Sequence, residues 1–475
     1  MTAPEVKATV YAGGLGLFAT QEIKEGTTIF AESSSIARLA PVDDEQEARL
    51  LQVLPPPSKK KNKDALFLDT IQVPNSVPPE YANKYKCMLQ AAACFAEFAD
   101  PSCQSDLSAL CRPDDNDVIV SVAKEGIKYI QHHSKGESSL RTMDPELLLG
   151  VMLVYTSNSF AGGRIYDRSS RLNHSCNPNC VVVPQGDAQS IVAACDITDG
   201  EELTISYLGT WLYADTATRQ SKLQVDKHFV CQCTRCTTYP NTAAAVPCPK
   251  CHERQGRYLE DDVAYDDDLM VHYCLPLSVL GDSSLYNCEK CGNLEQRYSP
   301  ALSEVSSLVS AKVIHFLDTR SVEDDDLDLQ EQLLELATMT LGTKHWTTNL
   351  LSLLRTDAIL KEQHTTMIQT SEPPSMEDVA QVIDSIERLE RFIQSLDLKL
   401  HMGHVLSYSM IGVARSLVSL GDFKSKTYAS KWILKIKAYT NTFESEGMKK
   451  VVSTLENAYK DGDDDYGDNN KKQRT

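Results

Sequence analysis

Apolar and polar residues alternate in two separate parts of the chain, and this alternation predicts short β-strands in both. Residues 5–36 contain VKATVY, LFATQEI and TTIFAES, separated by glycine-containing turns. Residues 180–207 contain CVVVPQG, SIVAACDI and ELTISYL, with the turn TDGE before the last of them. Alternation with a period of two is typical of a strand that buries one face. We therefore expect strands at 5–36 and again at 180–207.

A period of three to four residues predicts helices elsewhere. Residues 87–160 show it in CMLQAAACFAEFA and PELLLGVMLVYTSNSF, and residues from about 300 onward show it in LQEQLLELATMTL and VLSYSMIGVARSLVSL. Leu420-Gly421-Asp422 separates two helical stretches, which faintly resembles a tetratricopeptide hairpin, although one such unit makes no repeat array. Residues 37–86 interrupt both patterns with PPPSKKKNK and VPNSVPPEY, so a loop-like connection is predicted there.

The overall composition limits the class of protein. The chain has 475 residues, enough for roughly two to four domains, and its 42% apolar and 24% charged content is ordinary for a soluble globular protein. The formal net charge of -19 disfavours duplex DNA binding through a broad basic surface and is compatible with a basic protein partner. The first residues lack a signal-peptide pattern, and the apolar run at 147–155 is too short to span a bilayer. We expect a soluble, intracellular monomer that binds neither membranes nor specific nucleic-acid sequences.

Cysteine spacing points to a first metal site. Fifteen cysteines without a secretory signal favour metal ligands over disulfides. Cys231, Cys233 and Cys236 place three thiols on one tight turn, one fewer than the four ligands of a structural zinc site. Cys176, in the decapeptide RLNHSCNPNC at 171–180, is the candidate fourth ligand. Zinc bound in this way ties the decapeptide to a turn much later in the chain.

A second group of cysteines has the paired spacing of a zinc ribbon, with Cys248-x-x-Cys251 followed by Cys288-x-x-Cys291. His252, His272 and Cys274 lie nearby as alternative ligands, but a set of four cysteines needs none of them. Four protein ligands leave no open coordination position, so both sites are predicted to be structural. The cysteines without such spacing are predicted to be small buried apolar groups: Cys87, Cys94, Cys103, Cys111, Cys180, Cys195 and Cys274.

Four motifs occur in a specific order: GLGLFA at 14–19, LNHSCNPNC at 172–180, GEELTISY at 200–207 and CQCTRC at 231–236. In this order they resemble those of the SET-domain protein methyltransferases. The chain resembles more narrowly the SET-and-MYND group, in which an insert splits the SET core, an NSF triplet precedes its second half and a helical domain follows. Asn158-Ser159-Phe160 matches the triplet. The chain departs from that group because residues 37–115 lack the closely paired Cys and His ligands of a MYND finger.

The resemblance implies an α+β fold, in which a split, β-rich SET core carries a helical insert, a post-SET zinc site, a zinc ribbon and an all-α C-terminal domain. The expected segments are 1–36 (N-terminal part of the core), 37–157 (linker and helical insert), 158–210 (C-terminal part of the core), 211–240 (post-SET zinc segment), 241–300 (zinc ribbon), 301–460 (tetratricopeptide-like helical domain) and 461–475 (disordered acidic tail).

The resemblance also implies a cofactor, S-adenosylmethionine, and the residues that bind it. Main-chain groups of the turn Gly14-Leu15-Gly16 are expected to hold its amino-acid end, because glycine permits unusual φ and close backbone approach. Asn158, Asn173 and His174 are expected to contact it, Phe229 to pack on its adenine and Tyr166 to line the channel of the acceptor lysine. Tyr207, which ends GEELTISY, matches the catalytic tyrosine and also lies against the cofactor in the family.

The function implied by the resemblance is S-adenosylmethionine-dependent methylation of lysines in histones or other proteins. Lysine-containing proteins, such as a histone tail or another basic protein, are the expected substrates, and the nucleus, the cytoplasm or both the expected location. The alternative is a catalytically inactive SET scaffold that recruits partners through its helical C-terminal domain. A dedicated tetratricopeptide-type peptide binder would need several repeats, and the sequence has at most one hairpin of this kind.

Overall fold

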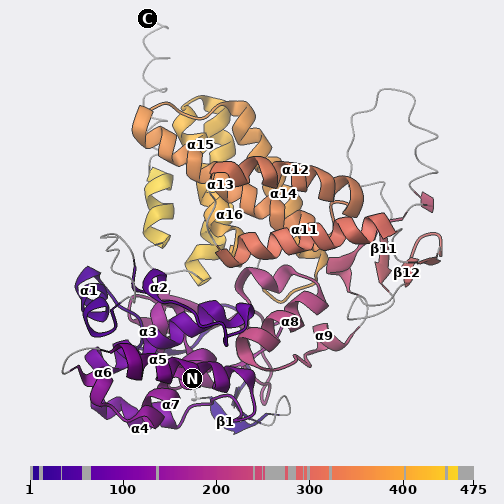
Figure 1. The fold of residues 1–475 in the computed structure, drawn as a ribbon. Coiled ribbons are helices and arrows are strands. Elements are labelled where there is room, and N and C mark those ends of the chain that lie inside the picture. Colours follow the sequence, from indigo (N-terminus) through magenta and orange to yellow (C-terminus); the bar gives the residue numbers. More distant parts are fainter. Residues whose placement is uncertain are drawn as a thin grey trace, which may run out of the picture. The chain divides into compact units, whose positions relative to one another are not determined.

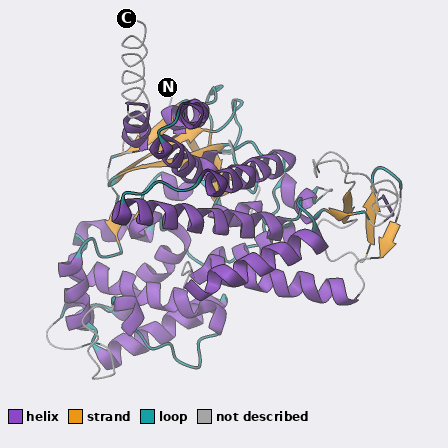
Figure 2. Cartoon of the chain, turned by 90° about the horizontal axis from the view of Figure 1, so that it is seen from above, coloured by secondary structure: helices purple, strands orange, loops and turns teal. Residues whose placement is uncertain are grey.

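The computed structural model describes residues 4–9, 14–33, 35–55, 66–134, 138–238, 241–248, 250–251, 273–276, 285–292, 294–296, 300–319, 324–400, 403–443 and 448–457. Helices predominate and several small sheets accompany them, so the predicted α+β class is confirmed (Figures 1 and 2). The chain forms two compact units. The first contains Met1–Ser175, Cys180–Tyr207 and Gln220–Cys231, and the second contains Cys176–Asn179, Leu208–Arg219 and Gln232–Thr475.

The small sheets of the first unit contain strands from the two segments in which strands were predicted, together with short strands at 37–38, 164–165 and 173–174. β1 (Glu5–Ala8) pairs with β2 (Leu15–Phe18), and β3 (Thr28–Glu32) pairs with β8 (Ala188–Ala193), which pairs in turn with β7 (Cys180–Gln185). β4 (Ala37–Arg38) pairs with β5 (Arg164–Ile165). All these pairs are antiparallel, whereas β6 (Asn173–His174) pairs in parallel with β9 (Thr204–Ile205).

An apolar core holds these sheets together. Apolar side chains from both predicted strand segments meet in it, and burial of such surface is the main favourable term in folding. Cys180 is 1% exposed in this core and packs as a small apolar group. The buried members are Leu17, Ala19, Ile23, Ile29, Phe30, Leu172, Cys180, Ile191, Ala193, Ile197, Leu203 and Ile205.

The insert between the two strand segments is helical and has a core of its own. Its helices are α1 (Asp44–Val53), α2 (Phe67–Thr70), α3 (Ala82–Phe98), α4 (Gln104–Ser108), α5 (Val118–His133), α6 (Ser139–Thr142) and α7 (Pro145–Asn158). The prediction that 37–86 is only a connection was wrong for α1, for α2 and for the first residues of α3. The first of these helices shows why. The side chain of Asp43 caps this helix by accepting from the Gln46 amide, and Leu50 and Val53 are buried in the core of the insert.

Short 3-10 turns connect several of these elements. They span Pro79–Tyr81, Pro101–Cys103, Ala161–Gly163, Ser169–Arg171, Gly209–Tyr213 and Thr242–Ala244. After β9 come the helices α8 (Thr216–Lys227) and α9 (Thr234–Thr237).

The C-terminal part of the second unit contains a small sheet and long helices. The antiparallel sheet has the order β10 (Val246–Pro247), β11 (Tyr273–Pro276), β12 (Leu285–Cys288) and β13 (Leu294–Gln296). The helices, salmon red to yellow in Figure 1, are α11 (Pro300–Thr319), α12 (Asp324–Leu341), α13 (Trp346–Thr370), α14 (Met376–Ser395), α15 (Gly403–Leu420) and α16 (Phe423–Phe443).

The predicted helical hairpin is present in this part. α15 ends at Leu420 and α16 begins at Phe423, and Gly421 between them has a φ of 75°, which glycine adopts without strain. The predicted disordered tail at 461–475 lies outside the described residues. None of the helices described has the length and apolar character needed to cross a membrane.

Candidate functional site

The parallel pairing of β6 with β9 brings His174 close to Tyr207. The pairing places His174 opposite Ile205, two residues before the tyrosine. The Tyr207 backbone N–H donates to Nδ1 of His174 at 3.0 Å, and the two ring centroids lie 5.3 Å apart. Nδ1 is therefore an acceptor, and the neutral imidazole carries its proton on Nε2.

The side chain of Tyr207 lies in a cluster of three rings. Phe229 is the third, with its centroid 6.5 Å from that of Tyr207 in an edge-on arrangement and 6.1 Å from that of His174. The Tyr207 hydroxyl donates to the Leu172 carbonyl. Burial raises the pKa of Tyr207 above its usual value, with Cys111 and Glu202 adding to this shift. The hydroxyl therefore stays protonated at neutral pH.

Leu15 and Gly16 lie in β2 rather than in the predicted turn, and Gly16 fits closely against polar side chains. A Cβ added to Gly16 would lie 2.4 Å from Oε1 of Glu202 and 2.9 Å from Nδ2 of Asn173. Gly14 is different, because nothing lies within 4 Å of its Cβ position. Neither glycine has a positive φ, so the expected conformational reason for glycine was wrong and close approach explains only Gly16. Leu15 between them is 55% exposed.

Asn173 connects the start of β2 to the second half of the core. Its Nδ2 donates to the Leu15 carbonyl at 3.1 Å and to Oε1 of Glu202 at 2.7 Å. Oε2 of Glu202 accepts from the Thr9 hydroxyl at 2.9 Å. The carboxylate therefore holds the β1–β2 hairpin beside β6.

Asn158 is the last residue of α7, and its side chain is held by the main chain. Its buried Nδ2 donates to the Cys111 carbonyl at 2.6 Å and to the Val154 carbonyl at 2.9 Å. Both protons of the amide nitrogen are used in this way, which leaves the side-chain oxygen as the group that can face a ligand.

Three of the cysteines predicted to be buried apolar groups are not buried. Cys111 is exposed, so the prediction was wrong for it, and Cys87 and Cys195 are only half-buried.

Lys227 is a residue of this site that the motifs did not reveal. Its Nζ lies 5.3 Å from the centroid of the Tyr207 ring and donates to the carbonyls of Thr156 at 3.1 Å and Ser157 at 3.0 Å. These carbonyls belong to the last turn of α7, where the helix dipole favours a cation. Burial lowers the pKa of Lys227 to about 8, and the nearby Asp226 partly opposes this. Lys227 therefore links the end of α7 to the catalytic-tyrosine candidate.

His228 follows Lys227 in a constrained conformation. Its φ is 64°, its side chain is 4% exposed, and Nδ1 lies 3.4 Å from Oδ1 of Asp117. Burial lowers its pKa to about 4, with Lys84 contributing in the same direction. The imidazole is therefore neutral near pH 7.

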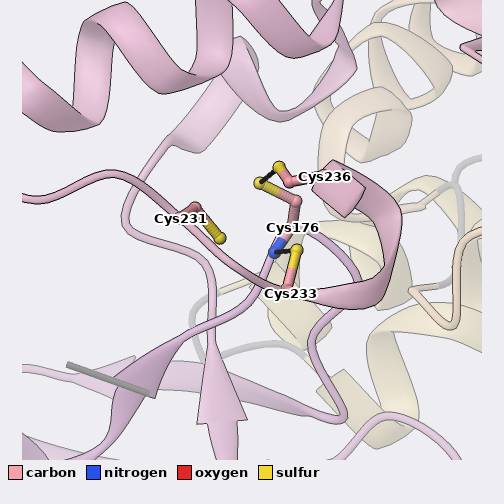
Figure 3. A group of neighbouring side chains, drawn as sticks. All are labelled: Cys176, Cys231, Cys233 and Cys236. Carbon is pink, nitrogen blue, oxygen red and sulfur yellow. Dashed lines mark hydrogen bonds between the residues drawn. The ribbon is translucent and has the colours of Figure 1, made fainter. Parts of the chain in front are cut away.

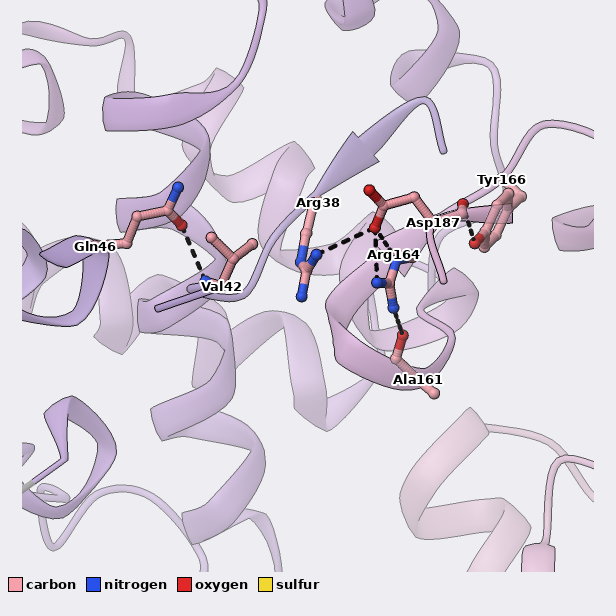
Figure 4. Close-up of polar contacts among 7 residues, drawn as sticks. All are labelled: Arg38, Val42, Gln46, Ala161, Arg164, Tyr166 and Asp187. Atoms are coloured by element: carbon pink, nitrogen blue, oxygen red, sulfur yellow. Dashed lines mark hydrogen bonds and ion pairs between the residues drawn. The ribbon is translucent and has the colours of Figure 1, made fainter. Parts of the chain in front are cut away.

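Tyr166 lies beside a separate group of charged side chains. Its hydroxyl donates to the Asp187 carbonyl at 2.8 Å, while the Asp187 carboxylate accepts from Arg164 at 2.8 Å and from Arg38 at 3.2 Å (Figure 4). Asp187 is in the turn between β7 and β8, so these bonds tie that turn to β4 and β5. The ring of Tyr166 is 2% exposed and packs edge-on against Phe160 at 5.6 Å.

The four cysteines proposed for the first metal site come together, as Figure 3 shows. The sulfurs of Cys176, Cys231, Cys233 and Cys236 all lie within 4.8 Å of one another, and all four residues are buried. Sγ of Cys176 and of Cys236 are 3.4 Å apart, too far for a disulfide. Tetrahedral zinc with bonds of about 2.3 Å would separate its sulfurs by roughly 3.8 Å. The donor set therefore fits zinc.

The ribbon cysteines form a second group of the same kind. The sulfurs of Cys248 and Cys291 are 3.7 Å apart and those of Cys251 and Cys288 are 3.9 Å apart, and all four lie within 4.8 Å of one another. Cys274 is opposite Cys288 in the β11–β12 pair and is buried outside this group. The alternative ligands His252 and His272 lie outside the described residues. This set also fits zinc.

Comparison with known proteins supports the SET assignment. Residues 14–208 match the SET domain family. The human histone-lysine N-methyltransferase SMYD3 is 40% identical over 82 residues, 17% of this chain and 19% of that protein. The pig N-lysine methyltransferase SMYD2 is 33% identical over 108 residues, 22% of this chain and 24% of that protein. The Arabidopsis thaliana histone-lysine N-methyltransferase ASHR1 is 40% identical over 70 residues, 15% of this chain and 14% of that protein.

In each case the match covers less than a quarter of the relative's length. The matched family segment includes Gly14, Asn173, His174 and Tyr207, and it ends before Phe229 and Lys227. Residues 14–208 therefore match the SET domain family, and the matched parts of the chain are similar to the lysine methyltransferases SMYD3, SMYD2 and ASHR1.

Proposed function

We propose that this chain is a protein-lysine N-methyltransferase that uses S-adenosylmethionine. The observation that carries the proposal is the ring cluster of His174, Tyr207 and Phe229, with Tyr207 tied to the His174 ring by a main-chain hydrogen bond. When bound, the cofactor supplies an electrophilic methyl group on a positively charged sulfur. The similarity of the SET segment to lysine methyltransferases supports the same activity.

The proposed cofactor-binding residues include the three of this cluster. They are Gly14, Leu15, Gly16, Asn158, Asn173, His174, Tyr207 and Phe229. The tight fit of Gly16 against Asn173 and Glu202 supports a role for the Gly14–Gly16 segment, because any larger residue at position 16 would displace both side chains. The half-buried ring of Phe229 offers an apolar face on which a heteroaromatic base can stack.

The acceptor lysine must lose a proton before it can attack. Its ordinary pKa of ~10.4 makes this cost about 4.6 kcal/mol at pH 7. Burial and a neighbouring cation both lower that pKa. Lys227 supplies a cation beside Tyr207, held in place by the last carbonyls of α7. Tyr207, the proposed catalytic residue, keeps its hydroxyl protonated and orients the reacting groups, so that catalysis comes mainly from alignment.

We propose zinc as a structural metal in both cysteine groups and lysine-bearing proteins as substrates, whether histones or others. The net charge of -19 favours the approach of basic proteins. A monomer in the nucleus or the cytoplasm is consistent with this proposal.

The decisive experiment measures methyl transfer from radiolabelled S-adenosylmethionine to histones and to a lysine peptide library. The wild type should label at least one lysine, and binding of the cofactor should raise the melting temperature of the protein. A protein that binds the cofactor but labels no lysine would be the inactive scaffold instead. A protein that neither binds nor transfers would refute the site proposed above.

A further inference from the structure

Two arginines lie beside the cysteine group of Cys176, Cys231, Cys233 and Cys236. Arg219, on α8, is 1% exposed and places Nη2 3.6 Å from Sγ of Cys236. The same nitrogen donates to the Thr216 hydroxyl at 3.1 Å, and Nη1 donates to the Ala214 carbonyl. The guanidinium is therefore held against the sulfur by neighbours in its own helix turn.

Arg235 approaches the group from α9. Its Nη1 donates to the carbonyl of Cys176 at 3.0 Å and to the carbonyl of Leu212 at 2.7 Å. The side chain is half-buried, and Cys176, Cys233 and Cys236 all act on it electrostatically. The two arginines thus contact the two thiol-bearing segments of the group, one through the sulfur of Cys236 and the other through the backbone of Cys176.

No carboxylate among the described residues forms an ion pair with either arginine; the charges that act on them are the thiols, and in the case of Arg235 also Arg219. A charge removed from water needs an opposite charge nearby, and backbone carbonyls supply only dipoles. Four thiolates and one divalent zinc carry a net charge of about -2. Two guanidinium groups balance that charge.

The ribbon group of Cys248, Cys251, Cys288 and Cys291 serves as an internal comparison. The buried apolar cluster that contains this group in the described part of the chain also includes Val246, Cys274 and Tyr286. Lys250 and Lys290, its neighbours in sequence, are exposed. The described contacts of Arg219 and Arg235 are with the Cys176 group, so the ribbon group tests whether the effect of these arginines is local.

We propose that Arg219 and Arg235 are the counter-charges of a metal-bound thiolate group, and that they set the metal affinity of the Cys176 site but not of the ribbon site. The proposal goes beyond methyl transfer and does not depend on it. It concerns charge rather than hydrogen bonding, and the two can be separated by substitution.

The test is a zinc-retention titration of the full chain with a competing chelator, which should give one release step for each site. Arg219→Gln and Arg235→Gln keep hydrogen-bond donors but remove the charge. Each should lower the zinc affinity of the Cys176 site by roughly 10- to 100-fold and leave that of the ribbon site unchanged. Arg219→Lys and Arg235→Lys keep the charge and should lower this zinc affinity less. Arg355→Gln is the matched control, because Arg355 forms an ion pair with Glu331 at 2.9 Å in the helical region and should leave both steps unchanged.

Four results would overturn the proposal. Equal losses in the Gln and Lys variants would show that hydrogen bonding matters and charge does not. Unchanged retention in the Gln variants, or absence of zinc from the Cys176 site of the wild type, would remove the need for counter-charges. Weakening of both zinc ions together would indicate general loss of structure. If Arg219→Gln fails to fold, the Arg235 pair at its half-buried position decides the question alone.

Discussion

The backbone N–H of Tyr207 donates to the ring nitrogen Nδ1 of His174 at 3.0 Å. This hydrogen bond joins the LNHSC segment to the end of GEELTISY. This bond uses the ring nitrogen that would otherwise take up a proton, and the parallel β6–β9 pairing places the two residues for it. It therefore makes the position of Tyr207 depend on the identity of residue 174.

Replacing His174 separates this hydrogen bond from the packing of its ring. His174→Ala removes the acceptor, and a buried N–H without a partner costs about 1–3 kcal/mol, in addition to the lost ring contacts. His174→Asn places a carbonyl oxygen near the position of Nδ1 and should recover the hydrogen-bond part of the loss. Urea unfolding of both variants measures the difference. Equal destabilisation would mean that only ring packing matters.

Tyr207→Phe should keep the fold, because the ring still packs against His174 and Phe229. It removes the hydroxyl that donates to Leu172 and, in the proposed mechanism, aligns the reacting groups. We expect a fall in the transfer rate on the order of 100-fold with little change in cofactor affinity. Tyr213→Phe, at another buried tyrosine, is the control and should retain the rate. Unchanged activity of the Tyr207 variant would be compatible with the proposed reaction but would show that the tyrosine hydroxyl has no part in it.

Lys227→Gln tests the cation beside Tyr207. Without that cation the acceptor amine loses its proton less readily, so the alkaline rise of the pH–rate profile should move to higher pH. Lys227→Arg keeps a cation and should move the profile less. Lys222→Gln on the same helix, where Lys222 lies 3.6 Å from Asp226, is the control. A Gln profile identical to that of the wild type would limit Lys227 to holding the end of α7.

The two cysteine groups should differ in their effect on function. Cys233→Ser should release zinc from the Cys176 site and abolish cofactor binding, because that site holds the loop that follows His174. Cys288→Ser should loosen the ribbon while methyl transfer is affected less. Zinc content and cofactor affinity of both variants check this. Fewer than two zinc ions per well-folded wild-type chain would contradict the assignment of the metal.

His228 should make stability depend on pH. Its pKa is about 4 in the folded chain against an ordinary 6.5, so between these values the unfolded chain binds a proton that the folded chain does not. The free energy of unfolding should therefore fall as pH is lowered from about 6.5 to about 4. Lys84, Asp117, Asp226 and Lys227 are the charged groups that act on this ring.

The variant His228→Asn removes this titration and tolerates the positive φ of 64°. Its loss of stability over the same pH range should be smaller than that of the wild type in unfolding experiments. The exposed His132→Asn variant is the control and should follow the wild type. Parallel curves for the His228 variant and the wild type would show that other groups dominate the pH response.

Much of the fold was predictable because local patterns agree with the tertiary arrangement. Alternation at 5–36 and 180–207 placed β1 to β3 and β7 to β9, although not the short strands β4, β5 and β6 or the strands of the ribbon. Helical periodicity together with Gly421 placed the α15–α16 hairpin. α1 was missed because its ten residues lie beside proline-rich, polar segments, and its apolar face becomes evident only once Leu50 and Val53 are seen to be buried. Cys111 was predicted to be buried because most cysteines are, and the residue type alone does not show how exposed a particular cysteine is.

The sequence by itself determined the chemistry that depends on residue type and spacing: the order of the motifs, the two sets of four cysteines and the candidate tyrosine. These features survive without knowledge of the fold because zinc and the SET motifs need particular residues at particular intervals. Only the tertiary structure decided which charges lie beside them. Lys227 and Arg219 are both on α8. The way this helix packs turns Lys227 toward the ring of Tyr207 and Arg219 toward the sulfur of Cys236. These contacts join residues that belong to no common sequence motif, so the local sequence pattern does not predict them.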